Sequence, residues 1–137
     1  MRVFFDSSAF VKRYVSEPGT NEVLDWCEQA TEIGLSAIAL PEIVSAFCRL
    51  QRERKINDTQ YLQLKSLLLA DVKDVSICDL TPIVLAQAVK ILEKSALRGM
   101  DAIHIGSAVT LQADVFVSAD QRQRDAAKLA GLRVEAV

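Results

Sequence analysis

The strongest constraint on the fold of this chain is a repeated alternation between short apolar strands and amphipathic helices. The expected strands are rich in β-branched and aromatic residues, and polar or turn-forming residues bound each of them. They cover residues 2–5, 33–36, 75–78, 115–118 and 132–136. Alternation of this kind is typical of parallel strands joined by crossover helices. We therefore expect an α/β fold, a three-layer α/β/α sandwich with a mostly parallel central sheet.

Helical segments fill the intervals between these strands. Their apolar residues recur at spacings of three and four, as Ile43, Phe47 and Leu50 do. The expected helices cover residues 7–14, 20–31, 39–55, 57–73, 81–96, 100–111 and 120–130. The helical pair between the second and third strands is expected to form a protruding hairpin. Because no repeat, low-complexity tract or linker divides the chain, residues 1–137 are expected to form a single domain.

Composition limits the class of protein. Half of the 137 residues are hydrophobic, which is enough for the core of one domain. No apolar run approaches the roughly 20 residues that span a bilayer, and Asp6 interrupts the first apolar run too early for a signal peptide. We therefore expect a cytoplasmic protein without a membrane partner. The cysteines Cys27, Cys48 and Cys78 are widely spaced, which favours reduced, mostly buried thiols over a zinc site or disulfides.

Four acidic residues occupy matching positions in the alternating pattern. Asp6 ends the first strand and Asp120 follows the fourth, while Glu42 and Asp101 lie in the first turns of two helices. The carboxyl ends of parallel strands meet at one edge of a sheet, so these side chains are able to converge in one pocket. Each acid also has an ordinary explanation, because an acid in a first helical turn stabilises the helix by about 0.3–1 kcal/mol and Asp is common in turns.

If the four carboxylates converge, their mutual repulsion requires either raised pKa values or a bound cation. Oxygen ligands without cysteine or several histidines select hard ions, so Mg²⁺ or Mn²⁺ is the expected cofactor. Such an ion activates water and neutralises charge on a phosphate. The pattern therefore indicates hydrolysis of a phosphodiester bond.

Four segments, in this order, resemble the signature segments of the PIN domain family. They are Val3–Ala9, Leu40–Ile43, Leu97–Ile105 and Val115–Asp120. The size of the chain is similar to that of the VapC toxins within this family. The resemblance covers essentially the whole chain and implies a Mg²⁺- or Mn²⁺-dependent endoribonuclease that cleaves structured RNA such as tRNA or rRNA.

The resemblance also implies roles for individual residues. Asp6 and Asp101 look like the most direct metal ligands, and Glu42 and Asp120 would complete the catalytic pocket, partly through waters. Ser7 and Ser118 look like hydrogen-bonding partners of these acids. We expect His104, the single histidine, to be packed beside the site without ligating the metal.

The expected partners are RNA, a small antitoxin protein and a second copy of the chain. The net charge of −2 shows no overall signature of a nucleic-acid-binding protein, so RNA contacts require local basic residues. The candidates are Lys12, Arg49, Arg98 and Arg122. Residues 49–55 carry a net charge of +3 at a helix end, which is also favourable for a helix with no ligand.

The antitoxin groove implied by the resemblance would suit exposed apolar residues on the early helices, such as Phe10, Val15 and Trp26. Two other functions remain open at this stage. One is a PIN-like module that binds RNA or protein without cleaving; the other is a phosphoryl-transfer enzyme that works through an aspartyl intermediate. The phosphatase pattern wants an acid two residues after Asp6, where Ser8 stands, and a receiver domain wants an acidic pair near the first strand, which is absent.

Overall fold

A computed structural model describes all residues, 1–137. Its central sheet contains five parallel strands in the order β3-β2-β1-β4-β5. They are β1 (Arg2–Phe5), β2 (Glu32–Ser36), β3 (Ser76–Cys78), β4 (Val115–Ser118) and β5 (Val134–Ala136). The expected α/β/α sandwich is therefore confirmed, and the first strand of the chain lies at the centre of the sheet.

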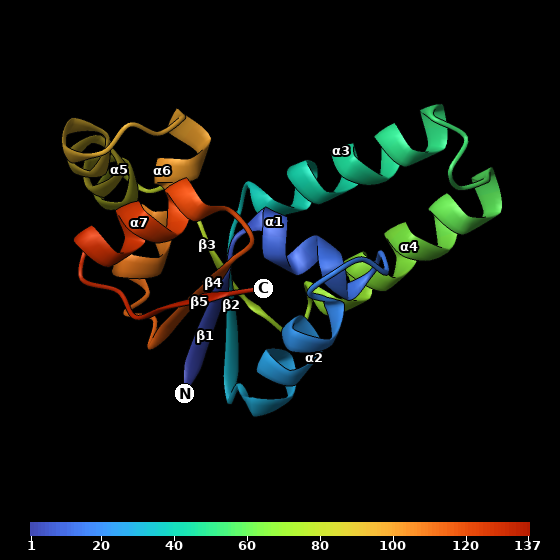
Figure 1. The fold of residues 1–137 in the computed structure, drawn as a ribbon, viewed down its shortest axis with the longest axis horizontal. Helices are drawn as coiled ribbons and strands as arrows, with labels where there is room; N and C mark the ends of the chain where they lie inside the picture. Colours follow the sequence, from blue (N-terminus) through green and yellow to red (C-terminus); the bar gives the residue numbers. More distant parts are fainter.

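Helices cover both faces of this sheet (Figure 1). One layer contains α1 (Ser7–Phe10), α2 (Thr20–Gln29), α3 (Ala39–Arg52) and α4 (Asp58–Asp71), and the other contains α5 (Pro82–Lys94), α6 (Gly99–Thr110) and α7 (Gln121–Leu129). The α3–α4 pair projects from the body as a hairpin, as the sequence predicts (Figure 1). None of the helices is both long and apolar enough to cross a membrane.

The alternation of side chains along β1 divides the core into two parts. Val3 and Phe5 pack beneath α1 to α4, whereas Phe4 faces α5 to α7. Phe4 stacks on Phe116 of β4 with ring centroids 6.0 Å apart. Because successive residues of a strand point to opposite faces, a short run of apolar residues is enough to anchor both layers.

The first expected helix, residues 7–14, is divided in the structure. The α-helix ends at Phe10, and a 3-10 helix continues through Val11–Arg13. The amide of Tyr14 donates to the carbonyl of Val11, a tightened last turn that satisfies a carbonyl left free by the helix end. The other expected boundaries agree to within a few residues.

The expectation that Phe10 is exposed is wrong. Its ring is 1% exposed and lies 5.4 Å from the ring of Phe5, in the larger part of the core. Val15 and Trp26 are half-buried against the same part of the core, and Arg133 lies over the Trp26 ring. Phe10 points inward because α1 is a single turn that follows directly from the buried end of β1.

Helices α5 and α6 pack closely against each other at Gly106. A Cβ atom placed on Gly106 would lie 3.0 Å from the carbonyl oxygen of Val84 and 3.1 Å from the amide nitrogen of Ala88. Both neighbours are backbone atoms of a regular helix, which cannot move independently. Glycine at this position therefore sets the separation between the two helices.

We expect Gly106→Ala to lower the free energy of unfolding by about 1–3 kcal/mol, because the overpacked helices must separate. The higher helix propensity of alanine, worth up to about 1 kcal/mol, offsets only part of this loss. Urea denaturation measures the effect. The matched control is Gly99→Ala, where an added Cβ meets nothing within 4 Å and stability should stay nearly constant. An unchanged midpoint for Gly106→Ala would contradict the close packing.

Candidate active site

The four acidic residues predicted from the sequence line one cavity of about 160 Å³. Ser7, Ser8, His104 and Gln123 complete its wall, and no hydrophobic side chain contributes. We call this space the acidic cavity. Asp6 follows β1 and Asp120 follows the adjacent parallel strand β4, while α3 and α6 begin at the same edge of the sheet. The strand order therefore accounts for the convergence, and the catalytic roles of these residues remain predictions.

Asp6 is the most deeply buried of the acids, with 2% of its surface exposed. One carboxylate oxygen accepts hydrogen bonds from the Ala9 amide at 2.9 Å and the Ser8 hydroxyl at 2.7 Å. The other accepts one from the Ser118 hydroxyl at 2.5 Å. Burial raises the pKa of Asp6 above its ordinary value, although these hydrogen bonds and the nearby His104 oppose the shift. The side chain is thus fixed in place before any ligand binds.

Ser118, predicted to support the acids, contacts two of them. Its hydroxyl donates to Asp6 and accepts a hydrogen bond from the backbone amide of Asp120 at 3.0 Å. Asp120 in turn caps α7, because one of its carboxylate oxygens accepts from the amides of Arg122 and Gln123. Asp120 therefore has a structural role at the helix terminus and also presents its second oxygen, which makes no hydrogen bond, beside the acidic cavity.

Glu42 is oriented by two neighbours. The Ser7 hydroxyl donates to its Oε1 at 2.7 Å, and the Nε2 atom of His104 lies 2.5 Å from the same oxygen. Burial alone would raise the pKa of Glu42, but the hydrogen bonds from His104 and Ser7 outweigh it and lower the pKa. Ser7 therefore supports an acid as the sequence predicts, and Oε2 of Glu42 remains without a hydrogen-bond partner.

His104 has a more direct position than the sequence suggests. It is buried, as expected, but it lines the acidic cavity and contacts Glu42, and its Nδ1 atom has no hydrogen-bond partner. Its place three residues after Asp101, on the first turns of the same helix, is the signal that could have identified this contact.

Gln123 was not identified from the sequence. Its side chain is buried in the wall of the cavity, and its Nε2 atom has no partner. Its spacing of three residues from Asp120 at the start of a helix is compatible with the same edge of the sheet, but glutamine in a polar helix is usually exposed. Nothing in the polar run of residues 121–124 singles it out.

Asp101 differs from the other three acids because its carboxylate makes no hydrogen bond. Burial raises its pKa, and the negative charges of Asp120 and Glu42 add to this effect, while His104 and Arg98 oppose it. A half-buried carboxylate with like-charged neighbours and no donor is unfavourable by itself. Asp101 thus has both oxygens available for a ligand that carries positive charge.

The chemistry of these donors fits a hard divalent cation. All four acids offer oxygen, and free oxygens remain on Asp101, Glu42 and Asp120. No group of three or more Asp, Glu, His or Cys side chains stands in a geometry that would hold a metal ion directly. Any ion at this site would therefore rely on waters or on a small movement of the three less buried acids, Glu42, Asp101 and Asp120.

Basic residues adjoin only part of the cavity. Arg98 and Arg122 line an open hollow that shares Asp101 and Asp120 with the acidic cavity. The structure does not bring Lys12 or Arg49 to this place. The ammonium group of Lys12 donates to the carbonyl of Pro18 and lies 3.6 Å from a Glu17 carboxylate oxygen, and Arg49 is exposed on α3.

Comparisons with known proteins agree with this architecture. The family model of the PIN domain matches residues 3–129. Ribonuclease VapC45 of Mycobacterium tuberculosis is 30% identical over 141 aligned positions, which cover 96% of this chain and 93% of the relative.

Two solved structures share the fold at low identity. VapBC2 from Rickettsia felis, bound to a DNA fragment from its promoter, aligns with a TM-score of 0.72 and 15% identity over 100% of this chain and 99% of that chain. A toxin–antitoxin complex from Klebsiella pneumoniae aligns with a TM-score of 0.68 and 11% identity over 88% of each chain.

We expect Asp101→Asn, in the presence of EDTA, to raise the free energy of unfolding by up to about 1 kcal/mol, because it removes a carboxylate that its neighbours repel. Thermal unfolding measures the change. The control is Asp58→Asn, which removes an exposed acid from the first turn of α4 and should be slightly destabilising through loss of the helix-dipole interaction. If Asp101→Asn also lowers the free energy of unfolding, the main effect of Asp101 is its favourable interaction with the N-terminus of α6. The repulsion by the neighbouring carboxylates is then unimportant.

Proposed function

This chain belongs to the PIN domain family, and from that premise we propose that it is a Mg²⁺- or Mn²⁺-dependent endoribonuclease, the toxin of a toxin–antitoxin pair. The observation that carries the proposal is the acidic cavity, where Asp101 presents two unpaired carboxylate oxygens beside three further acids. The related VapC45 is named a ribonuclease, which supports RNA as the substrate. Structured RNA such as tRNA or rRNA is the proposed target class.

The proposed ligands of the metal are Asp6 and Asp101, with Glu42 and Asp120 completing the pocket, partly through waters. When bound, the ion supplies positive charge at the phosphate and activates a water for attack. Asp6 is held rigid by Ser118, Ser8 and the Ala9 amide, so its position costs no reorganisation during the reaction. Asp101 gains an opposite charge at a position where burial and the carboxylates of Asp120 and Glu42 now raise its pKa.

Glu42 is the residue best placed to handle a proton. Its Oε1 is fixed by Ser7 and His104, and its Oε2 is free to accept a hydrogen bond from the attacking water. His104 acts through Glu42 as a positioning residue. The hydrogen bonds also keep Glu42 ionised by lowering its pKa, which makes it a weaker base and suits it better to orienting the attacking water.

Arg98 and Arg122 are proposed to attract the RNA backbone. Both guanidinium groups border the hollow that opens from Asp101 and Asp120, so a phosphate entering the site passes between basic and acidic groups. Positive charge at the entrance is needed because the cavity itself repels a polyanion.

A small antitoxin and a second copy of the chain are the proposed protein partners. The Klebsiella pneumoniae neighbour is a toxin–antitoxin complex, which supports the antitoxin. For the homodimer, α5 offers an exposed apolar strip formed by Leu85, Val89 and Leu92, which are 44%, 55% and 37% exposed. A strip at helical spacing on the outer face of a helix is suited to burial against a partner.

The deciding experiment is cleavage of a small-RNA pool by purified, partner-free protein with Mg²⁺, Mn²⁺ or EDTA. We expect discrete fragments with either metal, none with EDTA, and a loss of about a hundredfold or more in Asp101→Asn, because one charge is removed without a change of shape. Glu28→Gln, an exposed acid on α2, is the matched control and should cleave normally. Cleavage that survives in Asp101→Asn would refute the assigned site, and RNA binding without cleavage by the wild type would support a non-cleaving module.

A further inference from the structure

The acidic cavity is the first of four hollows that adjoin one another along α7. The second, with Arg98 and Arg122, shares Asp101 and Asp120 with it. The third, of about 500 Å³, shares Ala96 and Arg122 with the second. The fourth, of about 180 Å³, shares Ser95, Ala126 and Leu129 with the third. Because each hollow shares part of its wall with the next, they follow one another as a path along α7.

This path is bordered by basic side chains that have no partner in the protein. Arg98 and Arg122 lie near the acidic cavity, and Lys94 and Lys90 lie at the far end. None of the four forms an ion pair. We call the path from Arg98 to Lys90 the basic groove.

Beyond the acidic cavity, the basic side chains that line this groove outnumber the acidic ones. Asp125 is the acid in the third hollow, and its carboxylate accepts a hydrogen bond from the side-chain amide of Gln121. The fourth hollow is lined by no acid at all.

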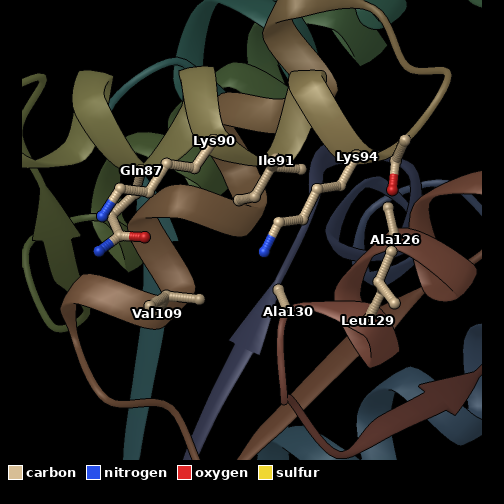
Figure 2. Close-up of a pocket in the computed structure, with 9 residues that line it drawn as sticks. Gln87, Lys90, Ile91, Lys94, Val109, Ala126, Leu129 and Ala130 are labelled. Carbon is tan, nitrogen blue, oxygen red and sulfur yellow. The ribbon is translucent and has the colours of Figure 1, made fainter.

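The far end of the groove combines charge with an apolar floor (Figure 2). The side chain of Lys94 extends from α5 into the space between α5 and α7, and the side chain of Lys90 lies beside that of Gln87. Ile91 and Val109 form part of the wall. Cations contact the phosphates of an unpaired nucleotide and a side-chain amide contacts its base edge, while the aliphatic wall offers an apolar surface without an aromatic stacking partner.

The lysines lie on a different flank of α5 from its exposed apolar strip. Gln87, Lys90 and Lys94 follow one another at spacings of three and four residues, and Leu85, Val89 and Leu92 do the same on the other side of the helix. A protein that covers the apolar strip would therefore leave the lysines accessible.

We infer that the basic groove binds a single-stranded RNA segment that flanks the cleaved bond, with Lys90 and Lys94 holding its distal phosphates. This inference rests on the proposed ribonuclease function and adds a defined path for the substrate. From Arg122 to Leu129 helix α7 advances about 10 Å, at about 1.5 Å per residue. The groove therefore accommodates a short segment of a few nucleotides beyond the acidic cavity.

The test compares Lys90→Gln/Lys94→Gln with a control of identical charge, Lys73→Gln/Lys128→Gln. Both control lysines are exposed and line none of these hollows. Binding of a fluorescein-labelled oligouridylate is measured in EDTA, so that no cleavage occurs, over a series of salt concentrations. Each single-strand phosphate contact contributes about 0.7 to the slope of log K against log salt concentration.

We expect the groove variant to bind more weakly than the wild type and its salt slope to be shallower by about 1.4, the contribution of two phosphate contacts, while the control variant keeps the wild-type slope. A thermal melt of each variant confirms that the exposed substitutions leave the fold intact. Equal slopes for the two variants would overturn the inference. If the groove variant binds RNA as tightly as the wild type but has a changed sedimentation coefficient, the inference is also overturned. The lysines then belong to a protein interface.

The same variants separate this inference from the proposed function. With Mg²⁺ or Mn²⁺, the groove variant should cleave with a raised KM and a nearly unchanged kcat, because the acidic cavity is intact. If the groove variant loses affinity in EDTA but the wild type never cleaves, the groove stands as an RNA-binding site and the ribonuclease proposal fails. If Asp101→Asn abolishes cleavage but the groove variant behaves like the control, the ribonuclease stands and the groove fails.

Discussion

The candidate site depends on the burial of one carboxylate at the end of the central strand. Removing an ionised carboxylate from water is costly unless hydrogen bonds replace its hydration. At Asp6 the replacements come from Ser8, the Ala9 amide and Ser118, and they involve the start of α1 as well as the end of β4. The Ser118 bond therefore does more than satisfy Asp6. It ties two neighbouring strands together at the edge of the sheet where Asp120 emerges, so the register of β1 and β4 determines the spacing of the acids.

The remaining acids show a second, opposing constraint. Asp101 has no donor and is raised in pKa by burial, Asp120 and Glu42, while Glu42 is lowered in pKa by its contacts with His104 and Ser7. Hydrogen bonds thus stabilise Glu42 as an anion, whereas Asp101 in the same cavity has no hydrogen-bond donor and a raised pKa. Groups with perturbed pKa values of opposite direction are typical of functional sites, where stability is given up for chemistry. A structural set of helix caps would not need an unpaired member such as Asp101.

The sequence predicted the helical layers of the sandwich, the edge of the sheet where the candidate site lies and the convergence of the acids. These features follow from hydrophobic periodicity and from strand direction. The prediction from sequence was wrong about Phe10 and incomplete for His104 and Gln123. These errors have a common physical cause, since the direction of a side chain depends on the rotational phase of its helix against the sheet. Phe10 lies on a one-turn helix whose phase is set by the end of β1, and Gln123 is turned inward because Asp120 caps α7. The pattern of apolar and polar residues along such short helices does not determine how either helix is rotated about its axis against the sheet.

The geometry of α5 connects the proposed interactions. Its inner face packs on α6 through the close approach at Gly106, so the helix cannot rotate to exchange its flanks. The apolar strip and the lysine flank are consequently held at fixed and separate orientations. A partner on the apolar strip and an RNA strand in the basic groove can then be bound at the same time. A protein that inserted into the acidic cavity, by contrast, would have to cross Arg98 and Arg122 and would compete directly with RNA. The proposed inhibition through the cavity and the proposed dimerisation through α5 would therefore be independent events on this fold.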